Sequence, residues 1–181
     1  FWDTANRYNN GSGNAERVIG RWFKRNPGQR RNIVLATKIY GGMDGVTPNH
    51  WGLSRSNILE SVYACLDRLQ TGCIDLLYFH AFDPVTPPEE SLAAIEDLVR
   101  QDLVRYFGVS NFTIPNLVSY QSASSEKTIR SKIVAVQNQY DMLHGEPVLY
   151  AGVREFASQT GMSFIAWSPL AGGLRTGRYL D

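Results

Sequence analysis

Six short apolar runs recur along the chain, and each one delivers a polar or aromatic group at its end. In one of them, residues 33–37 are followed directly by Lys38, at the point where a buried strand would end. An unpaired buried ammonium is costly, so a lysine in this position must be paired or functional. The pattern predicts strands at residues 1–3, 33–38, 74–80, 106–111, 133–137 and 163–168.

Between these runs the apolar positions change to a helical period. Residues 58–69 place their apolar side chains on one helical stripe, with Ser54 or Ser56 as the N-cap. A second helix starts at residues 86–90, where proline and acidic residues suit a first turn. Further helices are expected at residues 15–24, 115–122 and 147–160, and loops at the polar segments 41–56 and 121–131.

The regular alternation of strands and helices indicates βαβ units and a parallel sheet. In a parallel α/β barrel the C-terminal ends of the strands share one face, and active sites are built on that face. No linker, low-complexity tract or shift of composition divides the chain. We therefore expect one domain over residues 1–181.

Composition and charge limit the classes of molecule that the protein is expected to bind. With 181 residues and 43% hydrophobic content the chain can bury a sizeable core, and a formal net charge of +1 with interspersed signs argues against nucleic acid. No apolar run approaches the length of a membrane span, so no membrane partner is expected. Two cysteines are too few for a disulfide framework, and Cys65 lies on an apolar helical stripe, which favours a reduced, cytoplasmic protein.

Two classes of hydrolase fit the sequence poorly. A metal-dependent barrel hydrolase would need several histidines and a His-x-His pair, but the three histidines are separated and the cysteines are unpaired, so no metal ligands are expected. A Ser-His-Asp hydrolase could use Ser110, His80 and Asp3, yet the Gly-x-Ser-x-Gly elbow is absent.

Several motifs follow one another in a characteristic order. Residues 1–8 read Phe-Trp-Asp-Thr-Ala-Asn-Arg-Tyr, residues 34–38 end in Thr-Lys, and residues 68–80 end in Leu-Tyr-Phe-His. Residues 104–111, 137–140 and 167–170 complete the series. Together they resemble the aldo-keto reductases, NAD(P)H-dependent enzymes built on a (β/α)8 TIM barrel. The resemblance implies an incomplete barrel that begins at about the second strand, stops after the seventh, and is truncated at both ends.

The side chains in these motifs suit carbonyl reduction. The reaction needs a hydride donor, an acid for the developing alkoxide, and electrostatic help as charge appears on oxygen. A tyrosine hydroxyl is a poor acid near neutrality unless a nearby cation stabilises its phenolate, and Lys38 can supply that cation. By resemblance, Tyr8 is the general acid, Lys38 its activator, Asp3 the partner of the lysine, and His80 the group that orients the carbonyl and shares its proton.

The resemblance also implies where a cofactor would bind. The strand ends would supply hydrogen bonds to the nicotinamide carboxamide and an aromatic ring to stack on the nicotinamide, and the following glycine-rich loop would pass over the pyrophosphate. The residues implied for these contacts are Ser110, Asn111, Gln137, Trp167, Ser168, Leu170 and Arg175. The family favours NADPH over NADH, and the substrate would be a small aldehyde or ketone.

Other interpretations stay open. Taken singly, Asp3 and Lys38 fit a structural ion pair, His80 a core histidine, and Arg175 a solvated loop charge. The β subunits of voltage-gated potassium channels also belong to this family and serve chiefly as cofactor-bound partners of another protein. A catalytically weak regulatory or binding subunit is therefore the alternative function, and a homo-oligomer is compatible with either.

Overall fold

A computed structural model describes residues 1–43, 47, 50–126 and 131–179. Its strands are β1 (Trp2–Asp3), β2 (Leu35–Ile39), β3 (Ile74–Phe79), β4 (Val104–Ser110), β5 (Ile133–Gln139) and β6 (Ser163–Trp167). The helices are α1 (Asn14–Arg25), α2 (Arg55–Leu69), α3 (Pro88–Arg100), α4 (Ile114–Glu126) and α5 (Val153–Gln159). Short 3-10 turns are η1 (Pro27–Asn32), η3 (Val148–Tyr150), η4 (Ala171–Gly173) and η5 (Gly177–Tyr179).

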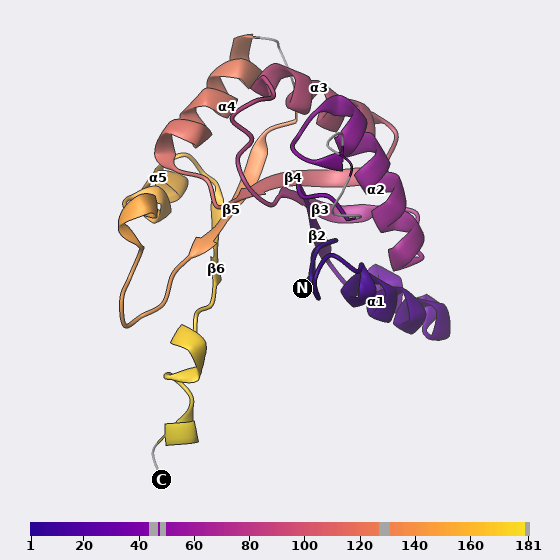
Figure 1. Ribbon diagram of the computed structural model, residues 1–181, viewed down its shortest axis with the longest axis horizontal. Helices are drawn as coiled ribbons and strands as arrows, with labels where there is room; N and C mark the ends of the chain where they lie inside the picture. Colours follow the sequence, from indigo (N-terminus) through magenta and orange to yellow (C-terminus); the bar gives the residue numbers. More distant parts are fainter. Residues whose placement is uncertain (44–46, 48–49, 127–130, 180–181) are drawn as a thin grey trace.

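The strands form one parallel sheet in the order β1-β2-β3-β4-β5-β6. Neighbours in the sheet are also neighbours in sequence, as expected when each strand returns through a helix to pair beside the last one. Figure 1 shows the sheet curled into an arch with the helices on its outer side, while η4 and η5 run away from it. The predicted fold is confirmed: the structure is a curled half of a (β/α)8 barrel.

Alternation along the strands separates two faces. On the outer face, Leu35, Leu77 and Phe107 join the large core shared with the helices. On the inner face, Ala36, Tyr78 and Ala135 belong to a second, much smaller cluster. Because side chains alternate between the two faces of a strand, Lys38 shares the inner face with Ala36. The inner face is therefore where polar groups are available for chemistry.

Local signals explain most helix boundaries. The side chain of Ser54 accepts a hydrogen bond from the backbone N–H of Asn57 at 3.3 Å, so Ser54 is the N-cap of α2 and Ser56 lies inside the helix. Pro88 and two acidic residues occupy the first turn of α3, as predicted. Asp102 adopts a φ of 56° just after α3, the left-handed conformation that Asp tolerates better than most residues.

Two sequence predictions were wrong in detail. Residues 121–126 are the last turns of α4 and not part of a loop: the hydroxyl of Ser125 donates to the carbonyl of Gln121 at 3.0 Å, and Ala123 is buried in the core. The helix expected over 147–160 is broken into η3 and α5. Gly152 between them has a φ of 81°, a left-handed conformation that interrupts a helix.

The buried carboxylate of Glu16 ties α1 to the rest of the fold. It accepts a hydrogen bond from Thr37 on β2 at 2.6 Å and forms an ion pair with Arg68 on α2 at 2.6 Å. Beside it Gly20 lets the two helices approach closely, because a Cβ there would lie 2.2 Å from the carbonyl oxygen of Arg68. The chain that follows β1 is thereby held against β2 and α2, beside the site described next.

Candidate active site

The centre of the site is the ammonium group of Lys38, which is buried on the inner face of β2. Its Nζ donates three hydrogen bonds: to Asp3 Oδ2 at 2.7 Å, to the carbonyl of Thr4 at 3.0 Å, and to the hydroxyl of Tyr8 at 2.8 Å. An ammonium has three donors, so all three are used. One cation is thus connected to one carboxylate and one phenol, with the Lys38 side chain 1% exposed and that of Asp3 30% exposed.

Parallel pairing brings these groups together although they are distant in sequence. Asp3 pairs with Ala36, and the chain after β1 continues along β2 through a hydrogen bond from the N–H of Asn6 to the carbonyl of Lys38 at 3.1 Å. It then turns at Asn9 and Asn10, whose φ angles are 63° and 59°, a conformation that asparagine tolerates. Tyr8 lies just before these two residues in the same turn, where its backbone N–H donates to the carbonyl of Ala5 at 3.4 Å and its hydroxyl reaches Lys38.

His80 lies next to this cluster, directly after β3. Its backbone N–H donates to the carbonyl of Ile39 at 2.9 Å, and its ring meets the edge of the Tyr8 ring with a centroid distance of 5.9 Å. Burial, and then the positive charge of Lys38, lower the pKa of His80 to about 4. At pH 7 the imidazole is neutral, so it can donate one N–H hydrogen bond without carrying charge.

A second group of predicted residues is organised around Asn111, which follows β4 with a φ of 59°. Its Nδ2 donates to the carbonyl of His80 at 2.9 Å and to Ser110 Oγ at 3.0 Å. Its Oδ1 accepts from Trp167 Nε1 at 3.1 Å and from the hydroxyl of Tyr150 at 3.4 Å. All four hydrogen-bonding positions of the amide are occupied by the protein. A bond from Asn111 to a carboxamide would therefore replace one of these.

Gln137 connects the two groups across the inner face. Its Nε2 donates to Asp3 Oδ2 at 3.3 Å, and its backbone carbonyl accepts from Ser110 Oγ at 2.8 Å. The structure thus brings seven of the predicted residues into one continuous network of contacts, with Trp167 as the eighth, joined through Asn111.

The remaining predicted residues lie beyond β6. Ser168 has a φ of 54°, and the segment that follows it contains Leu170, which is largely exposed, and Arg175, also exposed. Within the described residues, no hydrogen bond connects Ser168, Leu170 or Arg175 to the network around Lys38. The structure therefore places them at the edge of the site and does not unite them with it.

Sequence reasoning missed two contributors to the site. The carbonyl of Thr4 accepts from Lys38, which no side-chain pattern reveals. Tyr78 is buried on the inner face of β3, its hydroxyl has no hydrogen-bond partner among the described residues, and burial together with the charge of Asp3 raises its pKa. Its spacing of two residues from His80 places both on the same face, a signal that was available in the sequence.

An open cavity of about 470 Å³ adjoins this network and is lined by Tyr8, Tyr40, His80, Arg7 and Asn111, among others.

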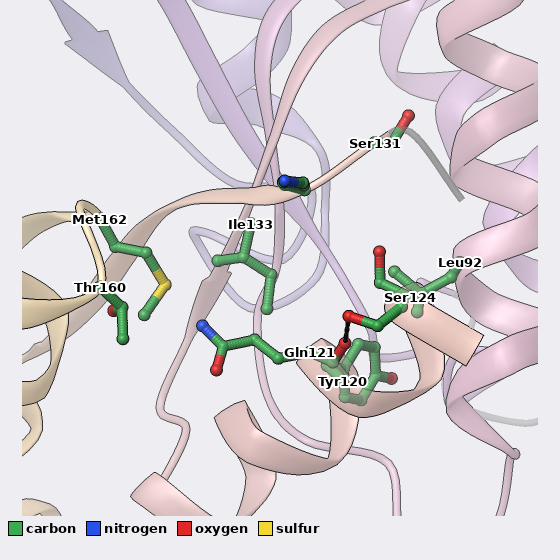
Figure 2. Close-up of a pocket in the computed structure, with 10 residues that line it drawn as sticks. Leu92, Tyr120, Gln121, Ser124, Ser131, Ile133, Thr160 and Met162 are labelled. Atoms are coloured by element: carbon green, nitrogen blue, oxygen red, sulfur yellow. Dashed lines mark hydrogen bonds between the residues drawn. The ribbon is translucent and has the colours of Figure 1, made fainter. Parts of the chain in front are cut away.

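A different cavity of about 340 Å³ lies between α4, the first residue of β5 and the turn before β6 (Figure 2). Figure 2 shows Gln121, Ile133 and Met162 around it. It is at the N-terminal end of β5, whereas Lys38 is near the C-terminal end of β2, and its described lining has no carboxylate or histidine. Of these two cavities, the first adjoins the hydrogen bond between Lys38 and Tyr8.

The described part of the chain offers neither a cluster of metal ligands nor a membrane-spanning helix. No group of three or more histidine, cysteine, aspartate or glutamate side chains there could hold a metal ion. Among the described helices, none is both long enough and apolar enough to cross a bilayer.

Comparison with known proteins agrees with this geometry. The family model described as "Aldo/keto reductase family" matches residues 1–181. The chain is 35% identical to aldo-keto reductase dtxS3 of Metarhizium robertsii, over 95% of this chain and 51% of the relative. It is 40% identical to the uncharacterized oxidoreductase YrpG of Bacillus subtilis, over 99% and 56%, and 33% identical to a probable voltage-gated potassium channel subunit beta of Arabidopsis thaliana, over 99% and 53%.

The chain spans about half the length of these curated relatives. The family model matches every residue of the chain. The half-barrel also carries the cluster of Asp3, Tyr8, Lys38 and His80 on its inner face, which agrees with that match. This chain belongs to the aldo/keto reductase family.

Proposed function

We propose that the protein is an oxidoreductase that reduces an aldehyde or ketone to an alcohol by hydride transfer from NADPH, with Tyr8 as the general acid. The observation that carries this proposal is the 2.8 Å hydrogen bond from Lys38 Nζ to the hydroxyl of Tyr8. Because Tyr8 is also partly exposed at the wall of the open cavity, its oxygen is accessible to a substrate on one side and to a cation on the other.

The proton is supplied by the protein. As the carbonyl oxygen gains negative charge, the Tyr8 O–H transfers its proton to that oxygen, and the resulting phenolate is stabilised by Lys38. Asp3 and the Thr4 carbonyl hold the ammonium in place. His80, which is neutral at pH 7, donates a hydrogen bond that orients the same carbonyl oxygen. A neutral imidazole is a much weaker proton donor than an imidazolium, so we assign the proton transfer to Tyr8 and the orienting hydrogen bond to His80.

The residues at the other strand ends suit a nicotinamide cofactor. The Trp167 ring is partly exposed and is held by its hydrogen bond to Asn111, so it would stack on the nicotinamide. Ser110, Asn111 and Gln137 would hold the carboxamide, and Ser168, Leu170 and Arg175 would lie toward the pyrophosphate. The cofactor supplies the hydride. The preference for NADPH over NADH rests on the family alone, and we propose residues 1–181 as a section of a single barrel domain.

The full-length protein with Tyr8→Phe tests this proposal. The substitution keeps the ring and removes the proton, so kcat should fall by a factor on the order of 10² or more while NADPH affinity stays nearly unchanged. Tyr63→Phe is the matched control, because Tyr63 is an exposed tyrosine on α2. Unchanged kcat in Tyr8→Phe would rule Tyr8 out as the acid. Tight NADPH binding by the wild type without turnover of any aldehyde would instead identify a binding subunit.

A further inference from the structure

Arg7 occupies a special position in the cavity wall. It immediately precedes the Tyr8 of the site, its side chain is exposed, and it lines the open cavity together with Tyr8, Tyr40 and His80. The cavity is of the size that holds small organic molecules. A molecule whose carbonyl oxygen reached Tyr8 and His80 would therefore have a guanidinium group close to the rest of its structure.

Among the described residues, ring stacking and packing hold the guanidinium group, and no ion pair does. Its Cζ lies 4.6 Å from the centre of the Trp51 ring, and that ring in turn meets the edge of Tyr40 with a centroid distance of 6.5 Å. On another side it lies against Gly41, where a Cβ would come within 2.5 Å of Arg7 Cδ and of Nη1. Stacking uses the flat face of a guanidinium and leaves its in-plane N–H donors available, which are the groups that bind a carboxylate in a two-pronged manner.

The positive charge of Arg7 is not neutralised within the described structure. No carboxylate there forms an ion pair with it. Asp3 is engaged with Lys38 and Gln137. Asp83 accepts from the N–H groups of Leu53 and Val85 and from the hydroxyl of Thr86. The charge of Arg7 nonetheless reaches the chemistry, since it contributes to the lowered pKa of His80.

We propose that Arg7 binds a carboxylate on the substrate, so that the protein prefers aldehydes or ketones that carry a carboxylate at the end remote from the reacting carbonyl. The inference rests on the proposed carbonyl reduction. Arg7 is a specificity-determining residue in this scheme: it contacts the substrate but takes no part in proton or hydride transfer. Trp51 and Gly41 position it.

The test compares two substrates that differ in one charge, 4-formylbenzoate and its methyl ester, using the full-length protein. Arg7→Gln should lower kcat/KM for the carboxylate by about 10- to 100-fold, the scale of a hydrogen bond to a charged group, mainly through KM, and change the ester by no more than about 3-fold. Gly41→Ala should reduce the same preference without removing the charge, because its Cβ displaces the guanidinium. Arg21→Gln, on the exposed surface of α1, is the control and should leave both substrates unchanged.

Binding without turnover separates this inference from the proposed function. Isothermal titration with 4-(hydroxymethyl)benzoate should show affinity in the wild type that Arg7→Gln lowers by about 10-fold or more. If that holds while no aldehyde is reduced, the carboxylate site stands and the proposed reduction falls. If the wild type reduces the ester but Arg7→Gln keeps the same carboxylate preference, or loses both substrates equally, the inference about Arg7 is overturned.

Discussion

Asp3→Asn should destabilise the fold more than Lys38→Met, although the two substitutions should lower activity to a similar extent. Both substitutions break the same 2.7 Å ion pair. Asp3→Asn leaves the ammonium of Lys38 buried without a counter-charge, although the amide oxygen can still accept a hydrogen bond. Lys38→Met removes the buried charge, replaces it with an apolar chain of similar length, and leaves Asp3 partly in contact with solvent and with Gln137 at 3.3 Å.

The exposure of the two partners sets the magnitude. Removing one partner of a fully buried pair costs about 3–5 kcal/mol, but the Asp3 side chain is 30% exposed, which reduces the expected loss for Asp3→Asn to about 2 kcal/mol. Replacing a buried charge by an apolar side chain is often close to neutral, so Lys38→Met should cost less than about 1 kcal/mol. Both variants should lower kcat on the order of 10²-fold, because each disturbs the cation beside Tyr8.

Equilibrium urea unfolding of the full-length protein, followed by circular dichroism, measures the stability change, and steady-state oxidation of NADPH with an aldehyde measures activity. Lys24→Met, on the exposed surface of α1, controls for the loss of a lysine. The reasoning would be refuted if Asp3→Asn were as stable as the wild type, or if Lys38→Met were the less stable of the two variants.

Three further perturbations test other parts of the structure. The pKa of His80 is about 4 in the folded chain and 6.5 ordinarily, so between those pH values the unfolded chain binds a proton that the folded chain does not. The free energy of unfolding should therefore fall by about 2–3 kcal/mol as the pH drops through this window. His80→Gln should abolish that part of the pH dependence measured by urea unfolding. Gly20→Ala should lower the free energy of unfolding by about 1–3 kcal/mol, because the new Cβ meets the backbone of Arg68. Gly28→Ala should be close to neutral, because a Cβ there has no neighbour within 4 Å. Equal midpoints of urea unfolding for the two variants would contradict this. Residues 1–181 expressed alone should aggregate or bind hydrophobic dye, and should bind NADPH poorly, because β1 and β6 are unpaired edges of the sheet. A segment that is monomeric by size exclusion and unfolds cooperatively in denaturant would disprove this expectation.

The sequence predicted the fold well because its strand signal and its helix signal have different periods. Each apolar run became a parallel strand, and Lys38 was recognisable because a lysine at the end of such a run requires a partner. The break at Gly152 and the extension of α4 to residue 126 were missed, since glycine and serine are compatible with both helix and loop until their tertiary contacts are known.

The details of the site were less predictable for a different reason. Arg7 and Trp51 are 44 positions apart and meet only because two loops after neighbouring strands fold onto the same cavity. No periodicity carries that information, because loop contacts depend on shape and not on a repeating pattern. The internal saturation of the Asn111 amide was equally hidden, as it requires partners from the residue after β3, from β6 and from η3.

The saturated amide of Asn111 has a consequence for protein engineering. One side chain holds the carbonyl of His80, on the side proposed for the substrate, and the indole of Trp167, on the side proposed for the cofactor. Directed evolution toward a different cofactor would therefore be expected to alter substrate selectivity as well whenever it shifts Trp167. Libraries that vary the two sides independently should contain few improved clones, whereas libraries that vary residues 80, 111 and 167 together should contain more.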